Sequence, residues 1–359
     1  METTDRADLG GWSPLLGEAR FIRRTLIVIA LVIASAGLLA LLLVAFHVFL
    51  LLFAGILLAV LLRAPTDWLV NHTRLSEKAA LAISMTALAV LFTLLAWLFA
   101  APLADQLGQL SETLPKAQAA LRKWMAEHAW TRPLMAWLAE SQRNGLDAEL
   151  VGKATGITLT VTFRTIVGVI VVLFIGVYLA LQPHVYRRGF LRLVPEQARL
   201  RAAQVLDEIG TTLRRWLVGR LITMLIVGHA FALGLWWLAV PFAPTLGIVA
   251  GLLEFVPYLG PTLAAVPAIL VAFNVEPRLA LDALVLYVAI QGAENYLLSP
   301  LIEQRTVYLP PALVIFSTVL LAIVAGALGA ALASPLAATL LVAVKRLYVQ
   351  QVADSPNFR

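Results

Sequence analysis

Long uninterrupted runs of apolar residues constrain this chain more than any other feature. The first run extends from Leu26 to Leu62, and a helix needs about 20 apolar residues to cross the hydrocarbon core of a bilayer. Hydrophobic residues make up 61% of the chain and charged residues 13%, whereas soluble domains average roughly 45–50% and 25%. The runs therefore predict an all-α polytopic membrane protein with about 8 transmembrane segments, some of them broken or re-entrant in the C-terminal half.

The alternation of apolar and polar stretches sets the expected organisation. The run 26–62 is long enough for two helices, so we predict a tight turn near Phe46–His47–Val48, and a third helix that stops at Pro102. In order, we expect a cytoplasmic tail at 1–25, the first three transmembrane helices at 26–101, an extracytoplasmic amphipathic region at 102–156, a fourth transmembrane helix at 157–181, a cytoplasmic amphipathic region at 182–217, a C-terminal transmembrane core at 218–347 and a cytoplasmic tail at 348–359.

The distribution of charge orients these segments. The region 182–217 has a large excess of arginine, whereas 102–156 carries balanced charge. Because lysine and arginine accumulate on cytoplasmic loops, we place 182–217 and both termini in the cytoplasm and 102–156 outside. The same bias accounts for the net charge of +6, so a nucleic-acid partner is not expected.

Both polar stretches show helical periodicity. Apolar side chains recur at spacings of three, four and seven, at Leu103, Leu107, Leu110, Leu114, Leu121 and Trp124 and again at Leu206, Ile209, Leu213 and Trp216. Such spacing is typical of amphipathic helices. These helices either lie on the bilayer or pack on the bundle, or they contact neighbouring subunits of a homo-oligomer.

The apolar segment 246–273 contains residues that a plain spanning helix would not carry. Proline at 257 and 261 removes backbone donors, and Gly260 permits unusual backbone conformations. Interrupted backbone at membrane depth is tolerated only where it is buried or lines a wet cavity. The segment is therefore predicted to be a discontinuous helix or re-entrant hairpin, and Glu254 is a candidate functional carboxylate. The alternative is a structural kink closed by neighbouring helices.

A polar stripe marks the next apolar segment, 279–298. Spacings of four, three and four place its members on one helical face: Tyr287, Gln291, Glu294 (with Asn295) and, after the segment, Ser299. In a membrane such a face is directed toward the bundle interior or a water path. The alternative is that the stripe forms interhelical hydrogen bonds with a structural role.

The last apolar segment, 310–344, is longer than one ordinary span. We predict that Gly326, Gly329 and Pro335 interrupt it. Together with 246–273 it would give two interrupted segments, each preceded by a plain span, which suggests an inverted pair of helix-plus-hairpin units.

Several function classes lack support. The chain has no cysteine, which excludes disulfides, cysteine-ligated metals and thiol catalysis. It contains no P-loop, zinc-protease, nucleophile-elbow or dinucleotide-binding motif. We therefore expect no enzyme activity, no catalytic residue, no metal site and no cofactor. Arg164 and Arg220 lie near span ends, where long cationic side chains reach toward water. The alternative is that Arg220 or Arg305 pairs with Glu254 or Glu294 and holds it ionised.

The C-terminal motifs resemble the autoinducer-2 exporter family of bacterial permeases. The resemblance rests on the stretches Glu254–Pro261, Glu294–Leu301 and Arg305–Pro311, and on the final glycine and Ser334-Pro335 motifs. It implies a secondary transporter of a small polar solute, such as the furanone-type signal autoinducer-2, driven by an ion gradient. Other members are linked to sodium/proton exchange, so a cation/proton antiporter is the first alternative, and a non-transporting membrane scaffold is the second.

The transport reading assigns a pathway to the C-terminal core. Its partners would be the lipid bilayer and a small-molecule or ion substrate. The residues expected to line or shape the pathway are Glu254, Pro257, Tyr258, Gly260, Pro261, Gln291, Glu294, Asn295 and Ser299.

Overall fold

Helices account for all the regular secondary structure in the described part of the chain. The computed structural model describes residues 13–128, 131, 159–298, 300–301 and 309–349. The chain divides into two compact units, Met1–Leu50 and Leu51–Arg359. The first unit contains the N-terminal part of one long helix, and the second contains every interhelical contact described below.

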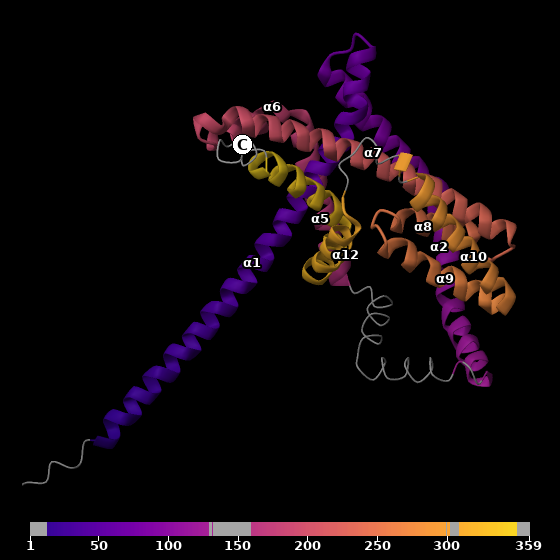
Figure 1. Cartoon of the computed structure of the whole chain (residues 1–359), viewed down its shortest axis with the longest axis horizontal. Helices are drawn as coiled ribbons and strands as arrows, with labels where there is room; N and C mark the ends of the chain where they lie inside the picture. The colour runs from indigo at the N-terminus through magenta and orange to yellow at the C-terminus, as the bar shows by residue number, and fades with distance from the viewer. Residues whose placement is uncertain (1–12, 129–130, 132–158, 299, 302–308, 350–359) are drawn as a thin grey trace, which may run out of the picture. The chain divides into compact units, whose positions relative to one another are not determined.

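Figure 1 shows the described helices in chain order. They are α1 (Ser13–His72), α2 (Glu77–Glu127), α5 (Leu159–Leu181), α6 (Pro183–Leu193), η2 (Glu196–Ala198), α7 (Arg199–Trp237), α8 (Ala243–Leu253), α9 (Leu259–Val275), α10 (Pro277–Ala293), η3 (Glu294–Leu298), α12 (Pro311–Val344) and η4 (Lys345–Val349). By length and composition, 3 described helical stretches can cross a membrane, and the bent pair of α5 and α6 would be a further one. The predicted all-α membrane architecture is confirmed at this level, but the predicted number of spans is not.

Two predicted helix ends are wrong. Helix α1 continues through Phe46–His47–Val48 without a turn, because these residues include neither glycine nor proline and every backbone N–H there can bond within the helix. Helix α2 likewise continues through Pro102 to Glu127. Beyond Pro102, Leu110 and Trp124 pack against α8 and α9, and this packing holds the continuation in place.

Helix α7 also crosses a predicted boundary. The part 199–217 of the expected amphipathic region and the span that follows it share this single 39-residue helix. A buried stripe runs along it through Leu213, Leu217, Val227, Phe231 and Leu235. The periodicity that identifies an amphipathic helix in the sequence therefore continues without a break into the apolar part.

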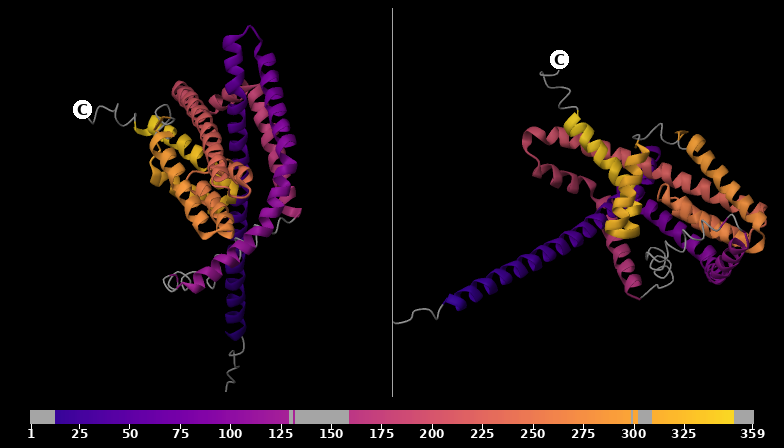
Figure 2. Two further views of the ribbon diagram at one scale, coloured as in Figure 1. Left: turned by 90° about the vertical axis from the view of Figure 1, so that its right-hand side faces the viewer. Right: turned by 60° about the horizontal axis from the view of Figure 1, so that its bottom comes forward.

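Two clusters of buried apolar side chains lie among the described residues of the second unit. One joins α1, α2 and α5 through Ala59, Leu62, Leu81 and Ala180. The larger one joins α2, α7, α8, α9 and α10, with Leu110, Phe231, Leu235, Leu246, Ala268 and Val271 among its members. Helices α8, α9 and α10 lie side by side next to α7 (Figures 1 and 2). The second part of α2 thus packs on the bundle, one of the two arrangements expected for the region after Pro102.

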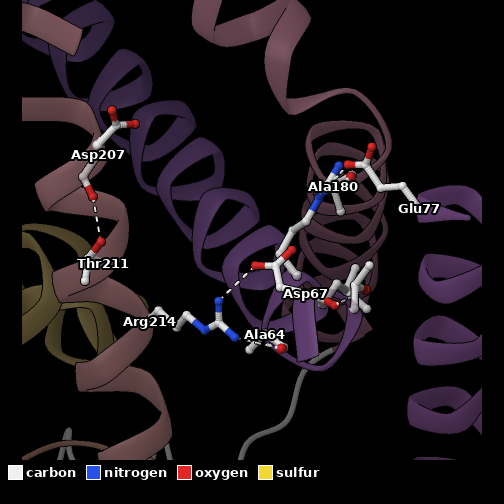
Figure 3. A network of polar contacts seen from close by, with 10 residues as sticks. Ala64, Asp67, Glu77, Ala180, Asp207, Thr211 and Arg214 are labelled. Carbon is white, nitrogen blue, oxygen red and sulfur yellow. Dashed lines mark hydrogen bonds and ion pairs between the residues drawn. The ribbon is translucent and has the colours of Figure 1, made fainter. Parts of the chain in front are cut away.

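Ion pairs connect these helices near the C-terminal end of α1 (Figure 3). Arg63 Nε donates to the carbonyl of Ala180 at 2.8 Å, and its guanidinium pairs with Glu77 at the start of α2. Arg214 of α7 pairs with Asp67 of α1 at 2.8 Å. The end of α1 is therefore bonded to α2, α5 and α7.

Candidate functional site

The apolar segment 246–273 is interrupted as predicted. Helix α8 ends at Leu253 and α9 begins at Leu259, and the two helices pack against each other. Between them, Leu259 N–H donates to the carbonyl of Pro257 at 2.8 Å across Tyr258, which has φ 64° and ψ −49°. This is a γ-turn with positive φ, a rare and strained conformation for a residue with a side chain. Strain of this kind is often found at functional sites.

Gly260 is required where α9 starts. A Cβ atom placed on it would lie 1.8 Å from the carbonyl oxygen of Leu253, the last residue of α8. A hydrogen is therefore the largest group that fits. Pro261 is buried next to it in the first turn of α9, where the missing N–H would have no partner within the helix.

Glu254 follows directly on α8 and is almost completely buried, with 1% of its surface exposed. Its Oε1 accepts from Arg220 Nη2 at 2.9 Å, and the same guanidinium donates to the backbone carbonyl of Glu254. Arg220 comes from α7, and its side chain is 12% exposed. A cation at this position also complements the negative end of the α8 dipole. Arg220 therefore donates hydrogen bonds both to the Glu254 carboxylate and to a backbone carbonyl at the C-terminal end of α8.

Glu294 brings a second carboxylate to the same guanidinium. It stands at the junction of α10 and η3, is 7% exposed, and its Oε1 lies 3.7 Å from Arg220 Nη1. Within the described residues, Oε2 of Glu254 and Oε2 of Glu294 have no hydrogen-bond partner. We name Glu254, Arg220 and Glu294 the acidic triad.

An aromatic pair fixes the interruption to α7. Trp216, one turn before Arg220, meets the ring of Phe255 edge to face, with ring centroids 5.7 Å apart. Such pairs contribute about 0.5–1.5 kcal/mol beyond their buried area. The turn of α7 that precedes Arg220 and the residue next to Glu254 are thus held together by a contact independent of charge.

The remaining residues of the predicted polar stripe are not all brought to the triad. Gln291 is half-buried, Asn295 is exposed, and Ser299 lies outside the described residues. The π-helical turn of η3 begins at Glu294, and a π-turn changes the angular register that α-helical spacing assumes. Tyr287 lies farther along α10, with its hydroxyl 3.5 Å from the hydroxyl of Thr262 on α9.

The last apolar segment bends once. Ala325 and Gly326 have non-helical backbone, with φ 63° at Gly326, whereas Gly329 and Pro335 lie within helical backbone. The predicted interruption is therefore at Gly326 alone. Gly329 has a different role, because a Cβ on it would lie 2.0 Å from the carbonyl oxygen of Leu321. Pro335 is buried within the helical part that follows the bend.

Arg220 was not among the residues predicted to line the pathway. It was expected near a span end, either reaching toward water or paired with a membrane glutamate, and the structure confirms the second alternative: it is largely buried and contacts both glutamates. The stripe of α7 could have identified it, since Arg220 follows Leu213 by seven residues and Leu217 by three, which is the spacing of one helical face.

Comparison with known proteins supplies the relatives of this chain. YueF of Bacillus subtilis (strain 168), an inferred transport protein, is 31% identical over 201 residues, which cover 56% of this chain and 51% of YueF. YrrI of the same strain, also an inferred transport protein, is 27% identical over 167 residues, covering 46% and 47%. A third, sll0060 of Synechocystis sp. (strain ATCC 27184 / PCC 6803 / Kazusa), is 24% identical over 294 residues, covering 78% and 83%.

The chain spans about half the length of YueF and YrrI, with matches over 51% and 47% of those proteins. The family described as "AI-2E family transporter" matches residues 26–348, most of the chain. This match includes every residue of the acidic triad and both interrupted apolar segments. The chain therefore belongs to the AI-2E transporter family.

Proposed function

We propose that this chain is a secondary transporter of the bacterial inner membrane that exports a small polar solute and is driven by an ion gradient. The observation that carries the proposal is the buried acidic triad at the interruption between α8 and α9. Secondary transporters use interrupted helices to offer backbone groups and ionisable side chains to a substrate. The first candidate solute is autoinducer-2, because the family description refers to it.

The charge of the triad supports ion coupling. Two carboxylates share one guanidinium, at 2.9 Å and 3.7 Å, so the ionised triad has one negative charge in excess. A buried charge without full compensation is costly. Binding of one proton or one monovalent cation would neutralise the triad, and its release would restore the charge. An ion gradient can therefore change the state of the site without any cofactor.

A non-transporting scaffold fits the triad less well. A purely structural ion network gains most when each buried lone pair is satisfied. Among the described residues, neither Glu254 Oε2 nor Glu294 Oε2 has a partner. Cation/proton antiport remains the second candidate, because the excess negative charge would also bind a sodium ion in competition with a proton.

The other pathway residues are assigned by position. Pro257, Tyr258, Gly260 and Pro261 would shape the opening between α8 and α9. The polar groups of Gln291, Asn295 and Ser299 would form hydrogen bonds with a solute along the continuation of α10. Arg220 joins this set through its contacts with both glutamates.

Proteoliposomes containing the purified full chain test the proposal. Flux of a panel of small polar solutes, autoinducer-2 included, is measured under imposed pH and sodium gradients, with a pH-sensitive dye inside the vesicles. The variants are Glu254→Gln and Glu294→Gln, which keep size and hydrogen bonding but cannot titrate. The matched control is Glu276→Gln, which removes an exposed carboxylate at the start of α10.

We expect the wild type and Glu276→Gln to respond equally to a pH gradient. The Glu254→Gln and Glu294→Gln variants should lose this response while retaining solute exchange. Proton movement on addition of sodium alone would identify the antiporter. Unchanged gradient-driven flux in both triad variants would refute the role of the triad, and a folded wild type without any flux would favour the scaffold.

The topology and assembly are part of the same proposal. Both termini and the region 182–217 would be cytoplasmic, the region 102–156 extracytoplasmic, and the amphipathic stretches would provide contacts in a homo-oligomer. The arginine excess of 182–217 supports this orientation. Because the chain has no cysteine, a single cysteine at Arg199 can be probed in intact cells. Labelling of that cysteine by a membrane-impermeant reagent would show that the proposed orientation is wrong.

A further inference from the structure

Helix α6 leaves the bundle at a right angle. Residues Thr165–Leu181 of α5 and Pro183–Leu193 of α6 meet at 90°. Helix α5 has 23 residues, about 35 Å of helix, which is sufficient to cross the hydrocarbon core of a bilayer. A helix perpendicular to a spanning helix runs roughly parallel to the membrane plane. The bend thus places α6 along the membrane surface, at the end of α5.

The surface of α6 is divided into an apolar and a basic face. At 100° per residue, Tyr186, Phe190 and Leu193 fall within about 60° of one another, whereas Arg188 and Arg192 lie on the other side of the helix, with Val185 next to Arg192. The four apolar side chains are exposed, up to 84% for Leu193, and α6 has no buried residue. The apolar face is therefore not covered by the described part of the chain.

One exposed ion pair joins α6 to α7. Arg187 Nη2 pairs with Asp207 of α7 at 2.6 Å, at the edge of the apolar face, about 60° around the helix from Phe190. Helix α7 therefore contacts α6 beside the apolar face and leaves that face exposed. Arg188 and Arg192 are both exposed.

We propose that α6 lies in the membrane interface and binds anionic phospholipid. Its apolar face (Tyr186, Phe190 and Leu193) enters the boundary between headgroups and acyl chains, and the guanidinium groups of Arg188 and Arg192 bind lipid phosphates. A helix with one apolar face and one cationic face is the type that inserts in this plane. Arginine presents paired donors that match phosphate oxygens.

Charge complementarity selects this occupant over a second copy of the chain. Two α6 helices joined through their apolar faces would bring two rows of arginine close together, which is unfavourable. An anionic lipid surface satisfies both faces at the same time. The inference goes beyond transport, because it concerns a surface that shares no residue with the acidic triad.

The first experiment locates each face. Single cysteines replace Phe190, Leu193, Arg188 or Arg192 in the cysteine-free full chain, carry a nitroxide label, and are studied in nanodiscs of phosphatidylcholine with phosphatidylglycerol. Labels at Phe190 and Leu193 should be accessible to oxygen, which partitions into lipid, and protected from a water-soluble nickel chelate. Labels at Arg188 and Arg192 should show the reverse. Protection of the apolar positions from both reagents would mean that a second copy covers them, and access of nickel to all four would mean that α6 lies in water.

The second experiment measures lipid selectivity. Native mass spectrometry counts phosphatidylglycerol and phosphatidylcholine retained by the full chain, by an Arg188→Gln/Arg192→Gln variant and by a control, Arg122→Gln/Lys123→Gln, which removes two adjacent exposed charges of α2. Each arginine near an anionic surface should change the preference for phosphatidylglycerol about fivefold. The control should keep the wild-type preference. An unchanged preference in the α6 variant would overturn the proposal.

Discussion

Replacement of Arg220 by methionine should destabilise the protein more than any exposed charge substitution. The guanidinium lies 2.9 Å from a carboxylate oxygen of Glu254 and 3.7 Å from one of Glu294. At an effective dielectric constant of about 20, these separations correspond to attractions of about 6 and about 4 kcal/mol before desolvation is subtracted. Since the side chains of the triad are only 1–12% exposed, solvent would replace little of this. We expect a net loss of about 3–5 kcal/mol, as for other broken buried ion pairs.

A fully neutral triad separates the cost of unpaired charge from the cost of lost packing. The Arg220→Met variant leaves two carboxylates without their cation, whereas a triple variant with Glu254→Gln and Glu294→Gln leaves none. Neutral replacement of a whole buried ionic cluster is often without cost, so the triple variant should recover most of the stability. Thermal unfolding in detergent, with tryptophan fluorescence as the readout, should place the single variant on the order of 10 °C below the wild type. Equal unfolding temperatures for the two variants would refute the argument.

Three further outcomes follow from the structure. Gly260→Ala should destabilise by at least about 1–3 kcal/mol through overlap with the end of α8, whereas Gly292→Ala, where no atom lies within 4 Å of the added Cβ, should leave the unfolding temperature unchanged or raise it. Asp67→Asn should cost only about 0.2–1 kcal/mol, because its ion pair with α7 is partly exposed. The hydrogen bond from Arg63 lowers the pKa of Glu77 below 4.5. This pair therefore stabilises the protein at neutral pH, and its contribution to the free energy of unfolding is lost as the pH falls below 4.5. In a Glu77→Gln variant, this loss of stability on acidification should be absent from the pH profile of unfolding.

The sequence was informative wherever the local chemistry of the backbone decided the structure. Prolines mark both interruptions, since Pro183 is the first residue of α6 and Pro257 lies between α8 and α9. Length alone was a poor guide: the run 26–62 suggested a turn that its residues do not support. Pairing of a membrane glutamate with Arg220 was an alternative that the sequence left open. That this one guanidinium contacts both glutamates could not be predicted, because the three residues meet through tertiary packing across 34 and 74 positions of sequence.

The two interrupted segments use the same steric device but differ in charge. Gly260 lies against the carbonyl of Leu253, and Gly329 against the carbonyl of Leu321, so each bend depends on a glycine placed seven or eight residues after a leucine. The first bend carries Glu254, whereas the corresponding part of α12 contains no acidic or basic residue. Both bends therefore provide close backbone packing. The ionisable side chains are concentrated at the first bend, where Arg220 of α7 contacts Glu254 and also Glu294 at the end of α10.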